Sequence, residues 1–185
     1  MPHKLTPIHQ AFFNLLKKKK YSEISIAEIA AYAHIGRRTF YLHYENKLQL
    51  YDELLGDFIE YHINPFIFSD TAENNLRDKL RIVIQEIDKF MDVALCLFDP
   101  DCPKTADSHL MTLLDEQQKK HENEGFFLRR FENPKTQRHY NHLICENLIS
   151  NIYFILENRD MDREALLDEM CKALDTISQY YRISA

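Results

Sequence analysis

The sequence predicts an all-α protein, in which an N-terminal three-helix unit precedes a larger helical bundle. Three observations support this fold class. The 185 residues include only three glycines and six prolines, long stretches repeat apolar residues with the 3.6-residue period of a helix, and capping residues stand ahead of those stretches. Scarce glycine also argues against a phosphate-binding glycine loop, a Rossmann turn and a multi-hairpin β fold. We expect a unit over residues 1–47, a connecting helix over 48–64 and a body over 65–185.

The first two helices of the unit are indicated by apolar spacing and by a capping box. One face of the first helix carries Ile8, Ala11, Phe12, Leu15 and Leu16. Ser25 precedes the second helix, and Glu28 stands three residues later, so each can satisfy the other's free backbone N–H group. Apolar residues then recur at i, i+3, i+4 and i+7, which predicts a helix of about two turns.

A tight turn and a third helix follow. His34 belongs to the residue types that tolerate a positive φ better than most, and Gly36 can act as a weak N-cap. Phe40 and Tyr44 lie at i and i+4, so they share a face that packs inward. Basic and hydrogen-bonding side chains are left outside. This arrangement is typical of a helix that enters the major groove of DNA, where arginine can bond guanine bidentately.

The charge distribution agrees with this interpretation. The whole chain carries a net charge of −6, which by itself argues against binding nucleic acid. Residues 1–47, however, hold eight Lys or Arg against three acids, a net charge of +5, so the remainder carries −11. A basic unit joined to an acidic body suits a protein that presents one end to a polyphosphate.

The stretch from about Ile8 to Leu55 resembles the DNA-binding domain of the tetracycline-repressor (TetR) family of transcriptional regulators. The most specific part is the TFY-x-HY-x-NK-x-x-L core from Thr39 to Leu50. The resemblance implies a helix-turn-helix protein, not an enzyme, that binds a palindromic site on double-stranded DNA as a homodimer. It further implies a repressor that is released by a small-molecule effector.

Carried over position by position, the resemblance assigns phosphate contacts and base contacts to the turn and the third helix. The expected DNA-binding residues are Ser25, Gly36, Arg37, Arg38, Thr39, Tyr41, His43 and Lys47. Ser25, Tyr41, His43 and Lys47 would bind phosphates, and Arg37, Arg38 and Thr39 would face bases. The family often has glycine at His34, a hydroxyl residue at Gly36 and a small residue at Arg38, so no operator sequence is carried over.

The body is predicted to contain several long helices. A connecting helix runs from near Asn46 toward Pro65, and residues 65–75 are expected to form a loop. Apolar residues then form one broad stripe over residues 80–98, ended by Asp99-Pro100. Further helices are expected over about 105–132, with a break near Gly125, and over about 134–158, and a last helix begins after Asp162.

Two further sites are expected in the body. The last two helices are expected to form the dimer interface, because their apolar residues exceed what one face can bury. The interface candidates are Leu148, Ile152, Leu167, Met170, Leu174, Ile177 and Tyr181. An effector pocket would be lined by the bulky residues Phe90, Met91, Phe98, Met111, Phe126 and Phe127.

Two other functions stay open on the sequence. His139, His142, Cys145 and Glu146 could belong to a metal sensor, but no second cluster matches them, and so we assign no metal ligand and no cofactor. The other alternative is a helical interaction module that does not read DNA. The four cysteines lack C-x-x-C spacing and are expected to be reduced and mostly buried. Without a signal peptide or an apolar span, a cytoplasmic protein that does not enter the membrane is expected.

Overall fold

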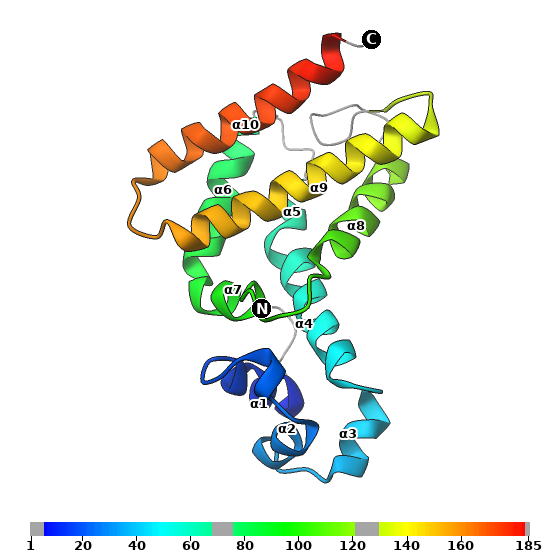
Figure 1. Ribbon diagram of the computed structural model, residues 1–185, viewed down its shortest axis with the longest axis vertical. Helices are drawn as coiled ribbons and strands as arrows, with labels where there is room; N and C mark the ends of the chain where they lie inside the picture. Colours follow the sequence, from blue (N-terminus) through cyan, green and yellow to red (C-terminus); the bar gives the residue numbers. More distant parts are fainter. Residues whose placement is uncertain (1–5, 68–75, 121–129, 184–185) are drawn as a thin grey trace.

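The helix-turn-helix unit occupies one end of the molecule in the computed structural model, which describes residues 6–67, 76–120 and 130–183 (Figure 1). The described chain is helical throughout, as predicted. The first part consists of α1 (Pro7–Leu16), the short 3-10 helix η1 (Tyr21–Glu23), α2 (Ile26–Tyr32), α3 (Arg37–His43) and α4 (Lys47–His62). In Figure 1, α2 and α3 lie at the lower end and α10 at the upper end.

The body is a bundle of six helices within the described ranges. They are α5 (Asn64–Ile67), α6 (Leu76–Lys89), α7 (Met91–Leu97), α8 (Ala106–Lys120), α9 (Pro134–Glu157) and α10 (Arg163–Ile183). Helix α9 packs against α8 on one side and against α6 and α10 on the other. Two arginines of α6, Arg77 and Arg81, bind Glu164 of α10.

Helix α4 links the two parts, because its buried side chains belong to a single hydrophobic core. That core runs from Ile8 in α1 through Leu50 and Phe58 of α4 to Leu174 in α10. Helix α4 itself contacts α5, α6, α7 and α8. A displacement within the body can therefore reach α3 through one continuous helix.

The structure corrects two boundaries predicted in the body. The apolar stripe over residues 80–98 was expected to form one helix, but it breaks at Phe90, whose φ of −114° and ψ of 29° are not helical. Neither glycine nor proline marks this break in the sequence. The break lets the Phe90 ring lie 4.1 Å from the His62 ring of α4, centroid to centroid. The expected loop after Pro65 begins with the short helix α5, in which proline in the first turn costs no hydrogen bond.

Two predicted helix starts and the state of the cysteines are confirmed. Helix α9 begins at Pro134, and the structure shows Asn133 as its N-cap. Asp162 caps the start of α10, because its carboxylate accepts a hydrogen bond from the backbone N–H of Ala165. All four cysteines are free, and Cys96, Cys102 and Cys145 are buried. The predicted break near Gly125 lies outside the described residues. No helix in the described part of the chain is long and apolar enough to cross a membrane.

Candidate nucleic-acid interface

Helix α2 begins with the capping box that the sequence predicts. The backbone N–H of Glu28 donates to the Ser25 hydroxyl, and the backbone N–H of Ser25 donates to the Glu28 carboxylate at 2.9 Å. Lys19 forms an ion pair with the same carboxylate. The hydrogen bond from Lys19 and those from Ser25 lower the pKa of Glu28 to about 2. The start of α2 is therefore well fixed at physiological pH.

The turn between α2 and α3 is closed by a backbone motif that places His34 in the left-handed region. His34 has a φ of 55°. The N–H groups of His34 and Ile35 donate to the carbonyls of Ala31 and Ala30, the pair of bonds that defines a Schellman motif. Because these bonds satisfy the last carbonyls of α2, the chain can turn sharply and restart as α3 at Gly36. Gly36 makes no side-chain cap, as the sequence predicts.

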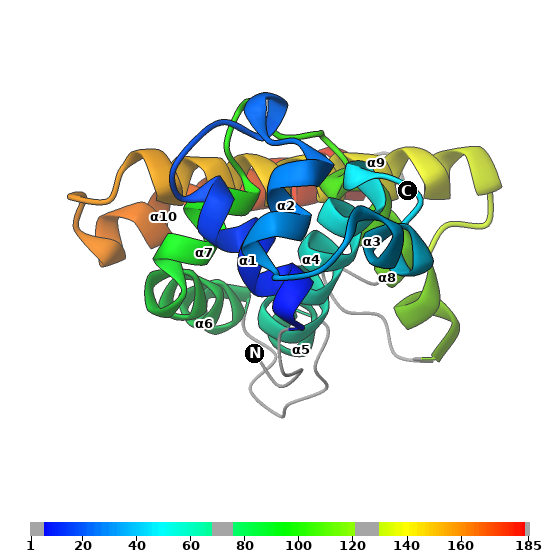
Figure 2. The same cartoon turned by 90° about the horizontal axis from the view of Figure 1, so that it is seen from below.

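Helix α3 is anchored by its inner face. Phe40 is fully buried and Tyr44, at the end of the helix, is nearly so. The hydroxyl of Tyr44 lies 2.7 Å from His9 Nε2 of α1, and the same nitrogen lies 3.2 Å from the Glu53 carboxylate of α4. Three helices thus meet at the base of α3, as Figure 2 shows from below. The predicted inward face is confirmed, and His9 is an anchor that the sequence did not suggest.

The outer face of α3 is exposed along its whole length. The exposed predicted residues are Gly36, Arg37, Arg38, Thr39, Tyr41 and His43. Neither Arg37 nor Arg38 makes a hydrogen bond or ion pair with any residue that the structure describes. All donors of both guanidinium groups therefore remain available to a ligand outside the protein.

Leu42 also lies on this face, although it was not among the residues predicted from the sequence. It is 77% exposed, the highest value among the large hydrophobic side chains that the structure describes, and its neighbour Tyr41 is 56% exposed. The signal was present, because a helix that turns Phe40 and Tyr44 inward must turn Leu42 outward. An exposed apolar side chain on such a helix can contact the methyl group of thymine.

Lys47 differs from the other predicted contacts, because its ammonium group is mostly used inside the protein. Its Nζ donates to the carbonyls of Tyr21 and Ile24 at 2.5 and 2.7 Å, and lies 4.0 Å from the centroid of the Tyr21 ring. Burial lowers the pKa of Lys47 from its ordinary value. Lys47 thus holds η1 against the start of α4, and of its three N–H groups one is left for a phosphate.

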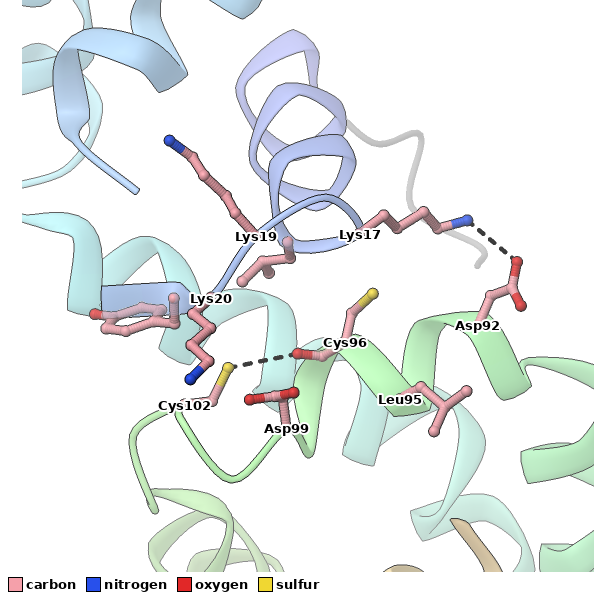
Figure 3. A pocket seen from close by; sticks show the side chains of 10 residues that line it. Lys17, Lys19, Lys20, Asp92, Leu95, Cys96, Asp99 and Cys102 are labelled. Atoms are coloured by element: carbon pink, nitrogen blue, oxygen red, sulfur yellow. Dashed lines mark hydrogen bonds and ion pairs between the residues drawn. The ribbon is translucent and has the colours of Figure 1, made fainter. Parts of the chain in front are cut away.

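Three of the four lysines that follow α1, Lys17, Lys19 and Lys20, line a cavity between α1 and α7. Lys17 lies 3.2 Å from Asp92 of α7, and both residues line this cavity of about 480 Å³ between the end of α1 and α7 (Figure 3). Beside this cavity, the backbone N–H of Ser22 donates to Asp101 at 2.7 Å. These contacts dock the helix-turn-helix unit on α7 and on the loop that follows it.

The predicted effector-pocket residues do not gather around one cavity. Phe98 lines a cavity of about 290 Å³ with Tyr51 and Tyr153, whereas Met111 lines a separate one of about 540 Å³. Phe90 and Met91 lie at the break between α6 and α7, where the Phe90 ring contacts His62 of α4, and neither residue lines either cavity. Phe126 and Phe127 lie outside the described residues. The effector pocket therefore stays a prediction for these residues.

The predicted dimer residues are mostly inside the chain's own core. Leu148, Ile152, Leu167, Met170 and Leu174 have exposed fractions of 3% or less, so almost no surface remains for a second copy to cover. Packing among α6, α9 and α10 already covers these five side chains and accounts for their near-heptad pattern, so their role in a dimer interface stays a prediction. Ile177 and Tyr181 lie in α10, at positions whose side chains are not described.

Comparisons with known proteins support the assignment of the N-terminal unit. Residues 8–54 match the family model described as "Bacterial regulatory proteins, tetR family". A comparison with curated proteins found no match. The fold is similar to that of a TetR transcriptional regulator from Streptococcus agalactiae 2603V, which is 22% identical, with a TM-score of 0.60 over 94% of this chain and 92% of that one. A second structure, "Dihydroxyacetone kinase operon activator DhaS", is 18% identical over 92% and 93% of the two chains, with a TM-score of 0.49.

Proposed function

We propose that this chain, whose residues 8–54 match the tetR family of bacterial regulatory proteins, represses transcription by binding a palindromic operator as a homodimer. The observation that carries this proposal is the outer face of α3. Arg37 and Arg38 stand exposed at its N-terminal end without partners among the described residues, above a base fixed by Phe40 and Tyr44. A rigid helix that presents free guanidinium groups has the geometry needed to read guanine in a major groove.

The individual contacts follow from exposure and chemistry. Arg37, Arg38 and Thr39 face bases, and Leu42 adds apolar contact with thymine. Phosphates are bound by Ser25, Tyr41, His43 and the remaining N–H group of Lys47. Gly36, which has no side chain, lets the protein backbone approach the DNA closely. Because phosphate contacts release condensed counterions, affinity for any DNA will fall steeply as salt rises.

The remaining parts of the proposal concern the body. Two recognition helices must be held one helical turn of DNA apart, which a two-fold dimer provides. Since the first candidates are buried, the dimer face must use the half-buried apolar residues of α9, such as Leu143 and Phe154. The division into a reading unit over 1–47, a connecting helix over 48–64 and an effector-binding and dimerising body over 65–185 belongs to the same proposal.

The effector cavity, in this proposal, is the one that touches α4. Tyr51 of α4 lines the cavity of about 290 Å³ with Phe98 and Tyr153, and its hydroxyl donates to the carbonyl of Leu97 at 2.6 Å. A ligand that displaced Tyr51 would move the helix that begins four residues earlier at Lys47. Such a shift would change the distance between the two recognition helices of a dimer.

The test is to capture sheared genomic DNA with the purified chain at moderate salt and to sequence what is retained. A two-fold-symmetric sequence should be enriched, and Arg38→Ala should weaken or alter that enrichment. Arg159→Ala, which removes an exposed arginine from the loop between α9 and α10, is the matched control and should leave it unchanged. Absence of any enrichment at low salt would reject DNA reading and favour a protein-interaction module.

A further inference from the structure

Three potential metal ligands from two helices meet where α8 begins beside α9. Asp107 lies in the first turn of α8, and His142 and Glu146 lie one turn apart on α9. Each offers one ligand atom, and the three atoms lie within 4.8 Å of one another. The sequence pointed to His142 and Glu146 but contained no sign of a third ligand, because Asp107 belongs to a different helix.

The distance between His142 and Asp107 is closer to that between two metal ligands than to that of a hydrogen bond. His142 Nδ1 and an Asp107 carboxylate oxygen are 3.6 Å apart, beyond the usual range for a nitrogen–oxygen hydrogen bond. Two ligands at about 2.1 Å from a tetrahedral ion lie roughly 3.4 Å apart. The other carboxylate oxygen of Asp107 is buried without a hydrogen-bond partner among the described residues. A cation bound by this carboxylate would supply the partner that the buried oxygen lacks.

The cluster is also accessible and electrically suited to a cation. It lies between two cavities, of about 540 Å³ on the side of His142 and about 290 Å³ on the side of Glu146, and Asp107 borders both. With a neutral imidazole, the two carboxylates leave a net charge of −2. Lys104 borders one cavity and Arg138 the other, but among the described residues neither forms an ion pair with the cluster.

Cys145, which the sequence places near His139 and His142, is not part of the cluster. The thiol is buried, and burial together with the nearby carboxylates, Asp107 first, raises its pKa to about 12. It therefore remains a protonated thiol inside the core. His139 borders the larger cavity but also lies outside the group of three.

We propose that Asp107, His142 and Glu146 bind a divalent first-row transition-metal ion that bridges α8 and α9. An imidazole with two carboxylates suits Zn²⁺, Mn²⁺, Fe²⁺ or Co²⁺ and disfavours Mg²⁺ and Ca²⁺, which prefer oxygen ligands alone. Three protein ligands leave at least one coordination position open to water or to another ligand.

The position of the cluster gives the metal a route to the DNA-binding end. Two residues after Asp107, the His109 ring lies against Gly56 of α4 so closely that a Cβ atom at Gly56 would stand 3.0 Å from it. His109 Nε2 is also 3.9 Å from the Asp52 carboxylate of α4. An ion that fixed the first turn of α8 on α9 would fix His109 and so bias α4. This regulatory consequence rests on the proposed function, whereas the metal site itself does not.

The experiment is a calorimetric titration of the untagged, chelator-treated full chain with Zn²⁺, Mn²⁺ and Mg²⁺ in the absence of DNA. We expect one Zn²⁺ ion per chain, bound at least tenfold more tightly than Mn²⁺, and no binding of Mg²⁺ at millimolar concentration. His142→Ala, Asp107→Asn and Glu146→Gln should each weaken Zn²⁺ binding at least tenfold. His139→Ala, on the same helix but outside the cluster, should leave it unchanged. Circular dichroism will show that each variant remains helical.

Three results would overturn the site: no Zn²⁺ binding, equal binding of Mg²⁺ and Zn²⁺, or Zn²⁺ binding that survives both His142→Ala and Asp107→Asn. Because these titrations contain no DNA, their outcome is independent of whether the protein reads an operator. A titration of the protein with DNA that carries the enriched sequence, with and without Zn²⁺, tests the regulatory consequence. A change in DNA affinity that disappears in His142→Ala supports it, and an unchanged affinity with the metal bound rejects it while leaving the site in place.

Discussion

The DNA-binding face and the cluster between α8 and α9 are built in opposite ways. Every residue of the former comes from the continuous stretch Ser25 to Lys47, where caps, a turn motif and one buried face fix the geometry. The latter depends on Asp107 meeting His142 and Glu146 from a distant part of the chain. A site made by local interactions leaves its pattern in the sequence, and a site made by helix packing leaves only part of one.

The largest expected effect separates the buried face of α3 from its exposed face. Phe40→Ala removes a fully buried ring, so we expect a loss of about 3–5 kcal/mol in the free energy of unfolding, together with loss of DNA binding. Leu42→Ala removes an exposed side chain and should change stability by no more than about 0.5 kcal/mol. Urea unfolding followed by circular dichroism measures both. If Phe40→Ala cost less than Leu42→Ala, α3 would not be anchored as described.

A second prediction asks whether Lys47 is a structural residue, a DNA contact or both. Lys47→Met keeps the aliphatic stem but removes the donors to the carbonyls of Tyr21 and Ile24, which should cost about 1–3 kcal/mol of stability. Lys18→Met is the control, since Lys18 is exposed and its polar contacts among the described residues are limited to the Tyr32 hydroxyl and ring. Thermal unfolding will distinguish them. Equal melting temperatures for the two variants would leave Lys47 as a phosphate contact alone.

A third prediction concerns the body and its pH dependence. Burial lowers the pKa of His62 below its ordinary value of 6.5, and this effect outweighs the hydrogen bond with the Glu86 carboxylate at 3.2 Å, which acts in the opposite direction. The unfolded chain therefore binds a proton more readily than the folded one does. His62 is neutral above pH 6.5 in both states, and its contribution to stability is lost as the pH falls below 6.5.

The urea midpoint of the native chain should accordingly fall as the pH is lowered below 6.5, toward 5. His62→Phe keeps a ring beside Phe90 but cannot be protonated, so its midpoint should fall less over the same range. Glu28 adds little slope over most of this range, because its ordinary pKa of 4.5, which applies to the unfolded chain, lies below it. Parallel curves for the two proteins would show that another group controls this part of the pH dependence.

The smallest effect concerns the turn that links α2 to α3. His34 has a φ of 55°, a conformation that costs a residue with a Cβ atom about 1–2 kcal/mol, whereas glycine adopts it freely. The greater freedom of glycine in the unfolded chain offsets part of this, so His34→Gly should raise stability by about 0.5 kcal/mol. His34→Ala keeps the strain and should give no gain. Differential scanning calorimetry can distinguish the two variants. A loss of stability in His34→Gly would mean that the imidazole makes a contact that stabilises the fold by more than the backbone strain costs.

Much of the fold and of the DNA-binding face could be predicted because the signals are local. The capping box of Ser25 and Glu28, the turn at His34 and the inward face of Phe40 and Tyr44 each involve residues within one or two helical turns of each other. Helix ends at Asn133 and Asp162 were readable for the same reason. Leu42 was readable too, since its exposure follows from the same periodicity.

The sequence alone determined the all-helical class, the helix-turn-helix unit and the identity of the side chains on its outer face, because short-range hydrogen bonds and helical period specify them. Only the tertiary structure decided that Lys47 binds two backbone carbonyls and that the helix breaks at Phe90. It also decided that the apolar stripes of α9 and α10 are covered within their own bundle and that Asp107 lies beside His142. These features depend on which helices pack together and at what angle. A periodic apolar stripe states that a helix has a buried face, but it does not state which neighbour covers that face.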